Sequence, residues 1–180
     1  MRRTTFATAA LAAAALTLVG CDQPKPRNPE PSAPAAGAQA PAKPAIPTVA
    51  EALPQPAWAA EVVGKNLRTT YPKEGTCTGN TDLVTKKYVG QPGGVEILGW
   101  GWDPAKKARV GKVVLIDRDY NIVGAGEGGV ERPDVPPTLP EVTDPNSGFH
   151  AYTTHLAGPV DTYGVIGAGD TVCPLGHLEY

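Results

Sequence analysis

The most strand-like segment of the chain reads Val95-Glu96-Ile97-Leu98-Gly99-Trp100-Gly101-Trp102. Successive side chains of a β-strand point to opposite faces, so Trp100 and Trp102 share one face. That face is either core or surface, and parity alone does not decide between them. We expect at least one indole to lie in the core. Trp102, which is nearer the strand end, is the better candidate for an exposed platform that stacks on sugar rings.

Other segments with strand character follow at intervals of 10–20 residues and are separated by loops rich in proline and glycine. Residues 112–117 (KVVLID) are rich in β-branched side chains, and a turn at residues 119–121 leads into a returning strand at 122–124. No long segment has the 3.6-residue period of a helix, so the chain is predicted to form an all-β, antiparallel β-sandwich. Its remaining expected strands are residues 83–89, 149–156, 163–168 and 172–178, and the proline-rich residues 132–145 are expected to cross over its surface.

The beginning of the chain has the features of a secretory signal. Arg2 and Arg3 precede an apolar run of about 14 residues, which ends in Leu18-Val19-Gly20-Cys21. This ending resembles the lipobox of bacterial lipoproteins, and the resemblance implies cleavage before Cys21 and attachment of lipid to that cysteine. The alternative is an uncleaved membrane anchor, but a spanning helix needs about 20 apolar residues. Two or three acyl chains would suffice as a membrane anchor.

The signal assignment predicts where the protein resides and how it is divided. Residues 1–20 are the predicted signal peptide, residues 21–57 a disordered Pro/Ala-rich linker, and residues 58–180 the β domain. Frequent prolines prevent a helix or sheet from propagating through the linker. The mature protein is expected to be lipid-anchored in the cell envelope and to face the periplasm. Asp22 resembles the inner-membrane retention signal of enteric-type lipoproteins and favours the inner membrane, with the outer membrane as the alternative location.

Two cysteines remain when Cys21 carries lipid. Cys77 and Cys173 form an even pair outside the cytoplasm, where disulfides persist, so we expect a Cys77–Cys173 disulfide. Two buried thiols are an alternative. A metal site is a further alternative, but no C-x-x-C motif and no histidine pair at ligand spacing accompanies the cysteines.

Several motifs together resemble a known module. In order along the chain they are Gly99-Trp100-Gly101-Trp102-Asp103, Val113-Val114-Leu115-Ile116-Asp117, Ile122-Val123-Gly124, Arg132-Pro133-Asp134-Val135, Gly148-Phe149 and Val172-Cys173-Pro174-Leu175. Over residues 74–178 this set resembles a β-sandwich at the C-terminal end of some bacterial membrane proteins, including glycosyltransferase-like ones. The resemblance implies an Ig-like, non-catalytic accessory fold in which Cys77 and Cys173 link the first and last strands.

Charge and motif content narrow the function. Removing residues 1–20 takes away Arg2 and Arg3, which leaves 14 basic and 18 acidic residues, a net charge of −4. This balance and the lack of a basic run argue against nucleic acid as a partner. The serines and histidines form no recognisable catalytic set, and the glycines at residues 124–129 are not followed by a helix as a phosphate loop requires. We therefore predict no catalytic residue, no metal and no cofactor.

The predicted function is a binding module for a glycan or for another envelope protein. Trp102, Arg132 and Asp134 are the candidate contact residues, although Arg132 and Asp134 could instead form an internal salt bridge that holds the crossover. One alternative is a structural or assembly lipoprotein, and another is an unrecognised hydrolase. An exposed Trp102 would favour glycan binding, an apolar patch or an unpaired strand edge would favour protein assembly, and a pocket with an acid–base pair would favour hydrolysis.

Overall fold

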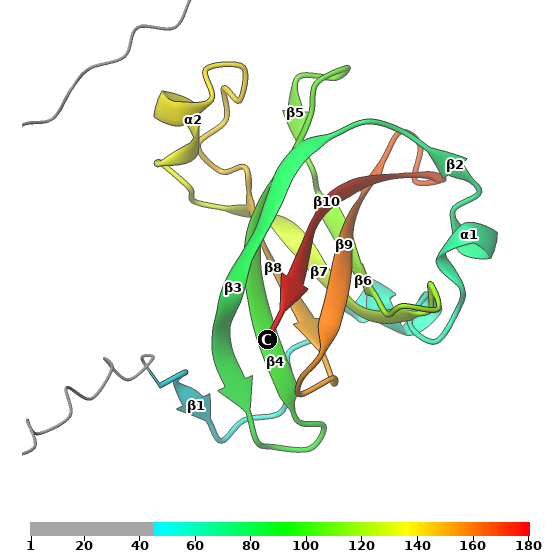
Figure 1. Cartoon of the computed structure of the whole chain (residues 1–180), viewed down its shortest axis with the longest axis vertical. Helices are drawn as coiled ribbons and strands as arrows, with labels where there is room; N and C mark the ends of the chain where they lie inside the picture. The colour runs from blue at the N-terminus through cyan, green and yellow to red at the C-terminus, as the bar shows by residue number, and fades with distance from the viewer. Residues whose placement is uncertain (1–44) are drawn as a thin grey trace, which may run out of the picture. The chain divides into compact units, whose positions relative to one another are not determined.

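The structure is a computed structural model that describes residues 45–180 (Figure 1). The predicted signal peptide, Cys21, Asp22 and most of the predicted linker lie outside the described residues. The short helices are the 3-10 helix η1 (Ala57–Glu61), α1 (Leu67–Thr70) and α2 (Val135–Thr138). The strands are β1 (Thr48–Val49), β2 (Lys73–Glu74), β3 (Thr78–Tyr88), β4 (Gly94–Asp103), β5 (Ala108–Arg109), β6 (Lys112–Ile116), β7 (Ile122–Val130), β8 (Gly148–Thr153), β9 (Pro159–Ile166) and β10 (Thr171–Glu179).

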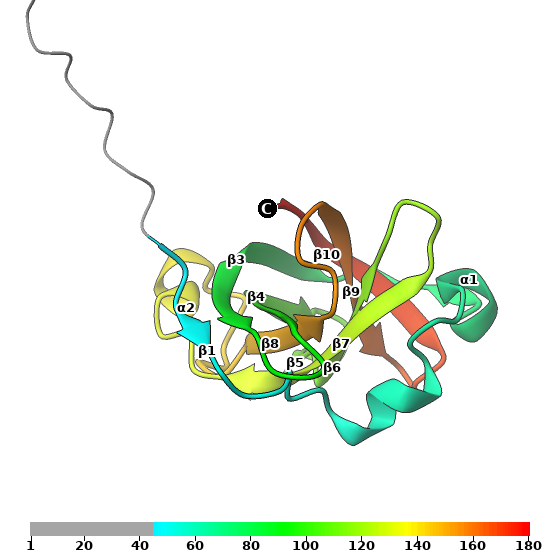
Figure 2. The ribbon, with the colours of Figure 1, turned by 90° about the horizontal axis from the view of Figure 1, so that it is seen from below.

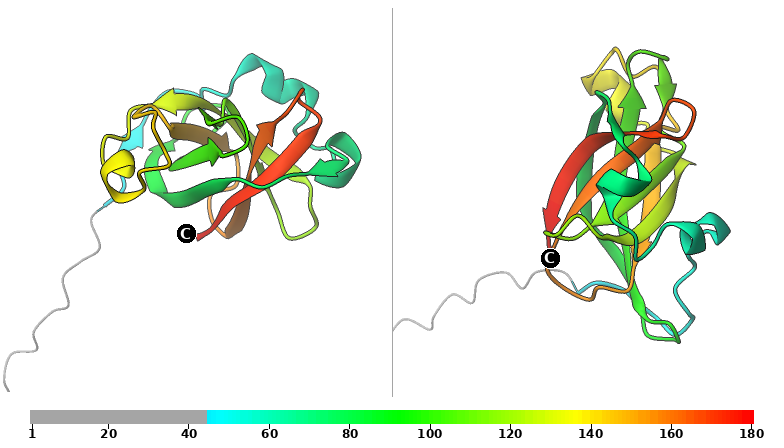
Figure 3. Two further views of the ribbon diagram at one scale, coloured as in Figure 1. Left: turned by 90° about the horizontal axis from the view of Figure 1, so that it is seen from above. Right: turned by 90° about the vertical axis from the view of Figure 1, so that its right-hand side faces the viewer.

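The long strands follow the order of an immunoglobulin constant-type domain. The hydrogen-bonded path is β1-β3-β4-β8-β7-β6-β9-β10-β2, and β5 pairs with β4 off this path. When the seven long strands are lettered A to G in chain order, β3, β4, β8 and β7 become A, B, E and D of one immunoglobulin layer, and β6, β9 and β10 become C, F and G of the other. The β6–β7 hairpin joins the two layers into one curled sheet, as Figures 1 and 3 show. The predicted all-β, antiparallel, Ig-like fold is confirmed.

The core lies between the two layers. It contains Val95 and Ile97 of β4, together with buried side chains of β3, β6, β8, β9 and β10. Val113 and Leu115 of β6 face this core, while Val114 and Ile116 face outward, as the two-residue period of a strand requires. Glycine at position 99 makes room for a neighbour, because a Cβ there would lie 2.3 Å from the ring of Phe149.

Two connecting segments cover the outer faces of the sheet. Trp100 and Trp102 share the outer face of β4, where Val135, Leu139 and Val142 of the crossover segment pack over them. On the other layer, the segment that contains η1 and α1 covers the outward side chains of β6. Figure 2 shows α2 and α1 at opposite ends of the domain. Both layers therefore bury side chains on both faces.

The domain begins earlier than the predicted boundary at residue 58. Strand β1 pairs in parallel with Lys87–Tyr88 of β3, and Leu53 is buried. All of the described residues, 45–180, belong to one compact unit. The last part of the predicted linker thus belongs to the domain, because its short strand β1 pairs with one end of the edge strand β3.

Candidate functional site

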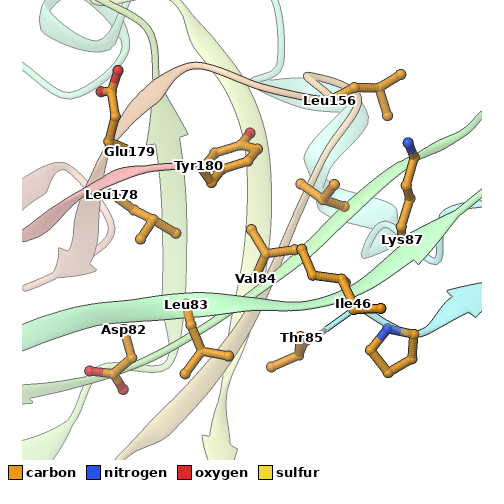
Figure 4. Close-up of a pocket in the computed structure, with 13 residues that line it drawn as sticks. Ile46, Asp82, Leu83, Val84, Thr85, Lys87, Leu156, Leu178, Glu179 and Tyr180 are labelled. Carbon is orange, nitrogen blue, oxygen red and sulfur yellow. The ribbon is translucent and has the colours of Figure 1, made fainter. Parts of the chain in front are cut away.

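A groove of about 730 Å³ opens between β3 and β10 (Figure 4). Val84 points from β3 toward Leu178 and Tyr180 at the end of β10, and Leu156 lies at the rim. The lining is mostly aliphatic. Its other members are Ala45, Ile46, Pro47, Asp82, Leu83, Thr85, Lys87, Val95 and Glu179.

The groove exists because β3 and β10 meet along only part of their length. Where they meet, a Cβ on Gly79 would lie 2.6 Å from Leu175, and one on Gly176 would lie 2.8 Å from the backbone nitrogen of Thr81. These glycines allow the two strands to approach without hydrogen bonds between them. The buried hydroxyl of Thr81 has no hydrogen-bond partner at this contact within residues 45–180. Beyond Gly176 the strands no longer contact each other in this way, and the groove begins there.

Both walls of the groove are edge strands. On the side away from β4, β3 pairs only at Lys87–Tyr88 with β1 within the described residues. On the side away from β9, β10 pairs only at Thr171–Val172 with β2 in that same part of the chain. The backbone between these two pairings has no strand partner there. An unpaired edge of this kind is a template for pairing with another chain.

Exposed apolar side chains line the rim of the groove. Leu83 is 50% exposed and Leu156 is 56% exposed, and Ile46 is 40% exposed beside them. Scattered exposed leucines are ordinary, but several around one apolar groove are typical of an interaction site. The arrangement can therefore bury an apolar segment on its side chains and pair with that segment through its backbone.

A buried carboxylate holds the β3 wall in place. Glu96 of β4 is 1% exposed, and it accepts hydrogen bonds from the Thr85 hydroxyl (2.7 Å) and the Tyr88 hydroxyl (3.0 Å). The Lys86 ammonium lies 3.2 Å from the same carboxylate, and Nδ1 of His150 lies 3.1 Å from it. A β-bulge between Val84 and Lys86 lets the successive residues 85 and 86 both reach Glu96.

The surroundings of Glu96 shift several pKa values. Burial by itself would raise the pKa of Glu96, but the hydrogen bond from Thr85, the nearby His150 and the bonds from Lys86 and Tyr88 together lower it. Burial and then the adjacent Glu96 carboxylate raise the pKa of Tyr88 to about 12. Burial and the same carboxylate raise the pKa of Tyr152 to about 12. Glu96 is therefore ionised at neutral pH, and these two tyrosines keep their protons.

A smaller polar pocket of about 380 Å³ lies beside His150 and Tyr152 on the outer face of β7 and β8. The Nδ1 atom of His150 contacts Glu96, a pairing that resembles the orienting half of a catalytic triad. However, the pocket is lined by Pro54, Pro56, Glu127, Gly128, Gly129, Val130, His150 and Tyr152, none of which is a serine, threonine or cysteine nucleophile. The interactions of Glu96 hold β3, β4 and β8 together.

Trp102, predicted as an exposed platform, is buried. The indole is 2% exposed because the crossover segment packs over it. It therefore cannot stack on a sugar ring in this structure. Trp100 and Trp102 lie on the same face of β4 because both pack into a second, smaller core.

Arg132 and Asp134 form the internal ion pair that was the alternative to ligand contact. Nε and Nη2 of Arg132 donate to Asp134 at 2.9 and 2.8 Å, and Nη1 donates to Asp82 of β3. These bonds raise the pKa of Arg132, first through the hydrogen bonds with Asp134 and also through those with Asp82. The guanidinium thus holds the crossover segment against β3, and three of its five N–H donors are engaged within the chain.

The two cysteines are paired as expected. Cys77 and Cys173 are joined by a disulfide, with their Cα atoms 5.5 Å apart. Cys77 directly precedes β3, and Cys173 lies in β10. The bond fastens the end of the β3–β10 seam that lies away from the groove.

In the described part of the chain, no group of three or more His, Cys, Asp or Glu side chains is arranged to hold a metal ion. Among residues 45–180, no helix is both long enough and apolar enough to cross a membrane.

The groove was not identified from the sequence, although two signals pointed to it. Leu83 and Val84 are adjacent apolar residues in a strand, so one of them must face away from the core. Glu96 is a carboxylate inside an apolar strand, which requires partners when it is buried. Which strands form the two edges depends on the complete pairing order, and that order cannot be read from local patterns.

No protein-family model, no curated protein and no solved structure matches this chain. The resemblance to a module of glycosyltransferase-like membrane proteins therefore stays a prediction.

Proposed function

We propose that this protein is a lipid-anchored cell-envelope lipoprotein whose β domain binds another envelope protein. The observation that carries the proposal is the apolar groove between β3 and β10, whose facing edges have no strand partner there within residues 45–180. An apolar groove with edge backbone on both walls suits an extended polypeptide, which supplies apolar side chains and backbone donors and acceptors together. The role is one of interaction or assembly.

A glycan ligand is the weaker candidate. Sugar-binding sites use exposed aromatic faces, and the indole proposed for that role, Trp102, is 2% exposed. The groove is lined by aliphatic side chains, with Tyr180 as its one aromatic residue. Such a lining offers little to the hydroxyl groups of a sugar.

The proposed location rests on the sequence before residue 45. The segment Leu18-Val19-Gly20-Cys21 supports lipid attachment at Cys21, and Asp22 supports retention in the inner membrane. The predicted linker from residue 21 would allow the groove to reach a partner some distance from the membrane surface. The same Cys77–Cys173 disulfide that closes the domain also suits a compartment outside the cytoplasm.

The test is a capture experiment with a matched control. Residues 21–180 carrying C21S would be immobilised and incubated separately with detergent-solubilised membranes, peptidoglycan and polysaccharide. L83K places a charge at the rim of the groove, whereas V89K changes a residue of similar exposure (53% against 50%) that does not line it. We expect a membrane protein to be captured by the starting protein and by V89K, but not by L83K. Capture of glycan alone, or of protein with no effect of L83K, would contradict the proposal.

A further inference from the structure

Strands β3 and β10 run in the same direction, because the sheet between them contains an odd number of long strands in antiparallel order. From β3 to β10 the path passes through β4, β8, β7, β6 and β9, and every step is antiparallel. Seven strands joined by six antiparallel steps place the first and last in parallel. The arrows of β3 and β10 accordingly point the same way in Figure 1.

Direct pairing of β3 with β10 would therefore break the antiparallel pattern of the sheet. Parallel pairs are slightly less stable per residue than antiparallel ones. The sequence of β10 also opposes such a pairing, since Pro174 has no backbone N–H and a β-bulge follows it at Gly176. The two strands stay unpaired in the described structure, and the groove lies between them.

The chain itself shows that both edges accept extended backbone, in each case as a parallel pairing of two residues. At one end of the groove, the amide of Lys87 donates to the carbonyl of Pro47 at 2.9 Å, where β1 adds to β3. Beyond the other end of the seam, β2 adds to β10 through two residue pairs. Ile46 and Pro47, which precede β1, already line the groove. The groove is thus continuous with an existing strand addition.

We propose that the groove accepts an extended segment of the partner protein as an eighth long strand, antiparallel to both β3 and β10. This proposal rests on the function proposed above and specifies how the partner binds. An eighth strand restores alternation around the whole sheet and gives both edges backbone partners of the more stable kind. It would face residues 82–86 of β3 and residues 177–180 of β10, so it needs about five residues, or roughly 16 Å of extended chain.

The lining also specifies the chemistry of the inserted segment. Val84, Val95 and Leu178 lie on the inner side of the groove, so every second side chain of the segment must be apolar. Leu83 and Leu156 lie exposed at the rim, so the alternate side chains meet a mixed surface of apolar groups and water. Proline is excluded from the centre of the segment, because amides on both of its edges must donate. An acyl chain would fill the same volume but would leave both backbone edges without partners.

A grafted strand tests this geometry without knowledge of the partner. A type I′ Asn-Gly turn added after Tyr180, followed by Val-Thr-Val-Thr-Lys, would return antiparallel to β10 and into the groove, with its valines opposite Tyr180 and Leu178, which pack against the core. The graft would be placed on residues 21–180 carrying C21S, and amide hydrogen exchange would be followed by NMR. A second protein would carry the same graft with both valines replaced by proline. We expect the valine graft to slow exchange of those amides of residues 82–86 that point away from β4 by at least about tenfold, and the proline graft to have no effect.

The capture experiment then connects the graft to the partner. If the valine graft fills the groove of its own chain, that variant should no longer capture the membrane protein. The variant with the proline graft should still capture it. If the starting protein captures no protein, the proposed function fails. If capture occurs but survives the valine graft, or if the graft leaves residues 82–86 unprotected, strand insertion alone is overturned. If the graft does not protect these amides but phosphatidylglycerol vesicles do, the groove binds an acyl chain. If only a higher protein concentration protects them, the groove binds a second copy of the chain. Either result would overturn the proposed strand insertion.

Discussion

The Thr85 hydroxyl donates a 2.7 Å hydrogen bond to the Glu96 carboxylate, and this bond ties the edge strand β3 to the buried outer face of β4. The neighbouring Lys86 reaches the same carboxylate because a β-bulge precedes it. Edge strands are the least constrained part of a sheet, and bulges are one means of controlling how they pair. Glu96 thus holds in shape the wall on which the proposed partner would bind.

Replacing Glu96 with glutamine should destabilise the domain. The E96Q variant leaves the Lys86 ammonium without its carboxylate and presents an amide N–H₂ group to side chains that are hydrogen-bond donors. Removing one partner of a buried, charge-assisted network costs about 2–3 kcal/mol. Urea unfolding followed by circular dichroism would measure the change. The control is E127Q, which alters an exposed acid on β7; an equal loss in both variants would show that Glu96 has no special role.

The same carboxylate predicts a dependence of stability on acid pH. The pKa of Glu96 in the folded domain lies below its usual value of 4.5. A carboxyl with a lowered pKa adds stability above its unfolded pKa, and that stability is lost as pH falls through the folded pKa. The difference in unfolding free energy between wild type and E96Q should therefore be constant near neutral pH and shrink below about pH 4.5. A difference that stays unchanged down to pH 3 would contradict the assignment.

The sequence predicted the fold because the strands have strong local signals. The segment from Val95 to Trp102 and the KVVLID segment at residues 112–117 are both strands in the structure, within one or two residues at their ends. The crossover at residues 132–145 was also located correctly, and it covers the sheet around the short helix α2. Local composition and alternation were sufficient for these elements.

The sequence did not predict the site, because the site depends on long-range packing. Trp102 was expected to be the more exposed indole on account of its position near the strand end, yet Val135 and Val142, more than thirty residues later in the chain, cover it. The groove requires β3 and β10, which are far apart in sequence, to be the two ends of one sheet. The start of the domain was missed for a similar reason, since β1 is a two-residue strand within a proline-rich segment.

Tyr88 and Tyr152 predict a loss of stability in strong alkali. Burial and Glu96 raise the pKa of each from 10.0 to about 12. A group with a raised pKa adds stability that is present below its unfolded pKa and is lost as pH rises through the folded pKa. The domain should therefore lose stability between pH 10 and pH 12. Titration of absorbance at 295 nm should show these tyrosines ionising late, and Y152F should remove one late-titrating group; ionisation of all tyrosines near pH 10 in the folded protein would refute the prediction.

The disulfide should be a large contributor to stability. It joins residues 96 positions apart and fastens the start of β3 to β10. In the chain-entropy model, a loop of this length is worth about 4–5 kcal/mol. The C77A/C173A variant should therefore unfold at a markedly lower urea concentration, and amides near the β3–β10 contact should exchange faster. Reductant should have the same effect on the wild type and none on the variant, while C21S, outside the domain, should leave the unfolding free energy unchanged.

Gly176 sets how closely the closed part of the seam can pack. Its φ of +156° disfavours other residues, and an added Cβ would lie 2.8 Å from the backbone nitrogen of Thr81. Gly158 also has a positive φ (+108°), but a Cβ there would meet nothing within 4 Å. G158A therefore measures the backbone penalty by itself, about 1 kcal/mol, whereas G176A adds the clash and should cost about 2–3 kcal/mol. Because that clash pushes β10 away from β3, G176A should also speed amide exchange at residues 79–81, measured by NMR, and G158A should not. Equal unfolding free energies for the two variants would mean that β3 and β10 are not in contact at this point in solution.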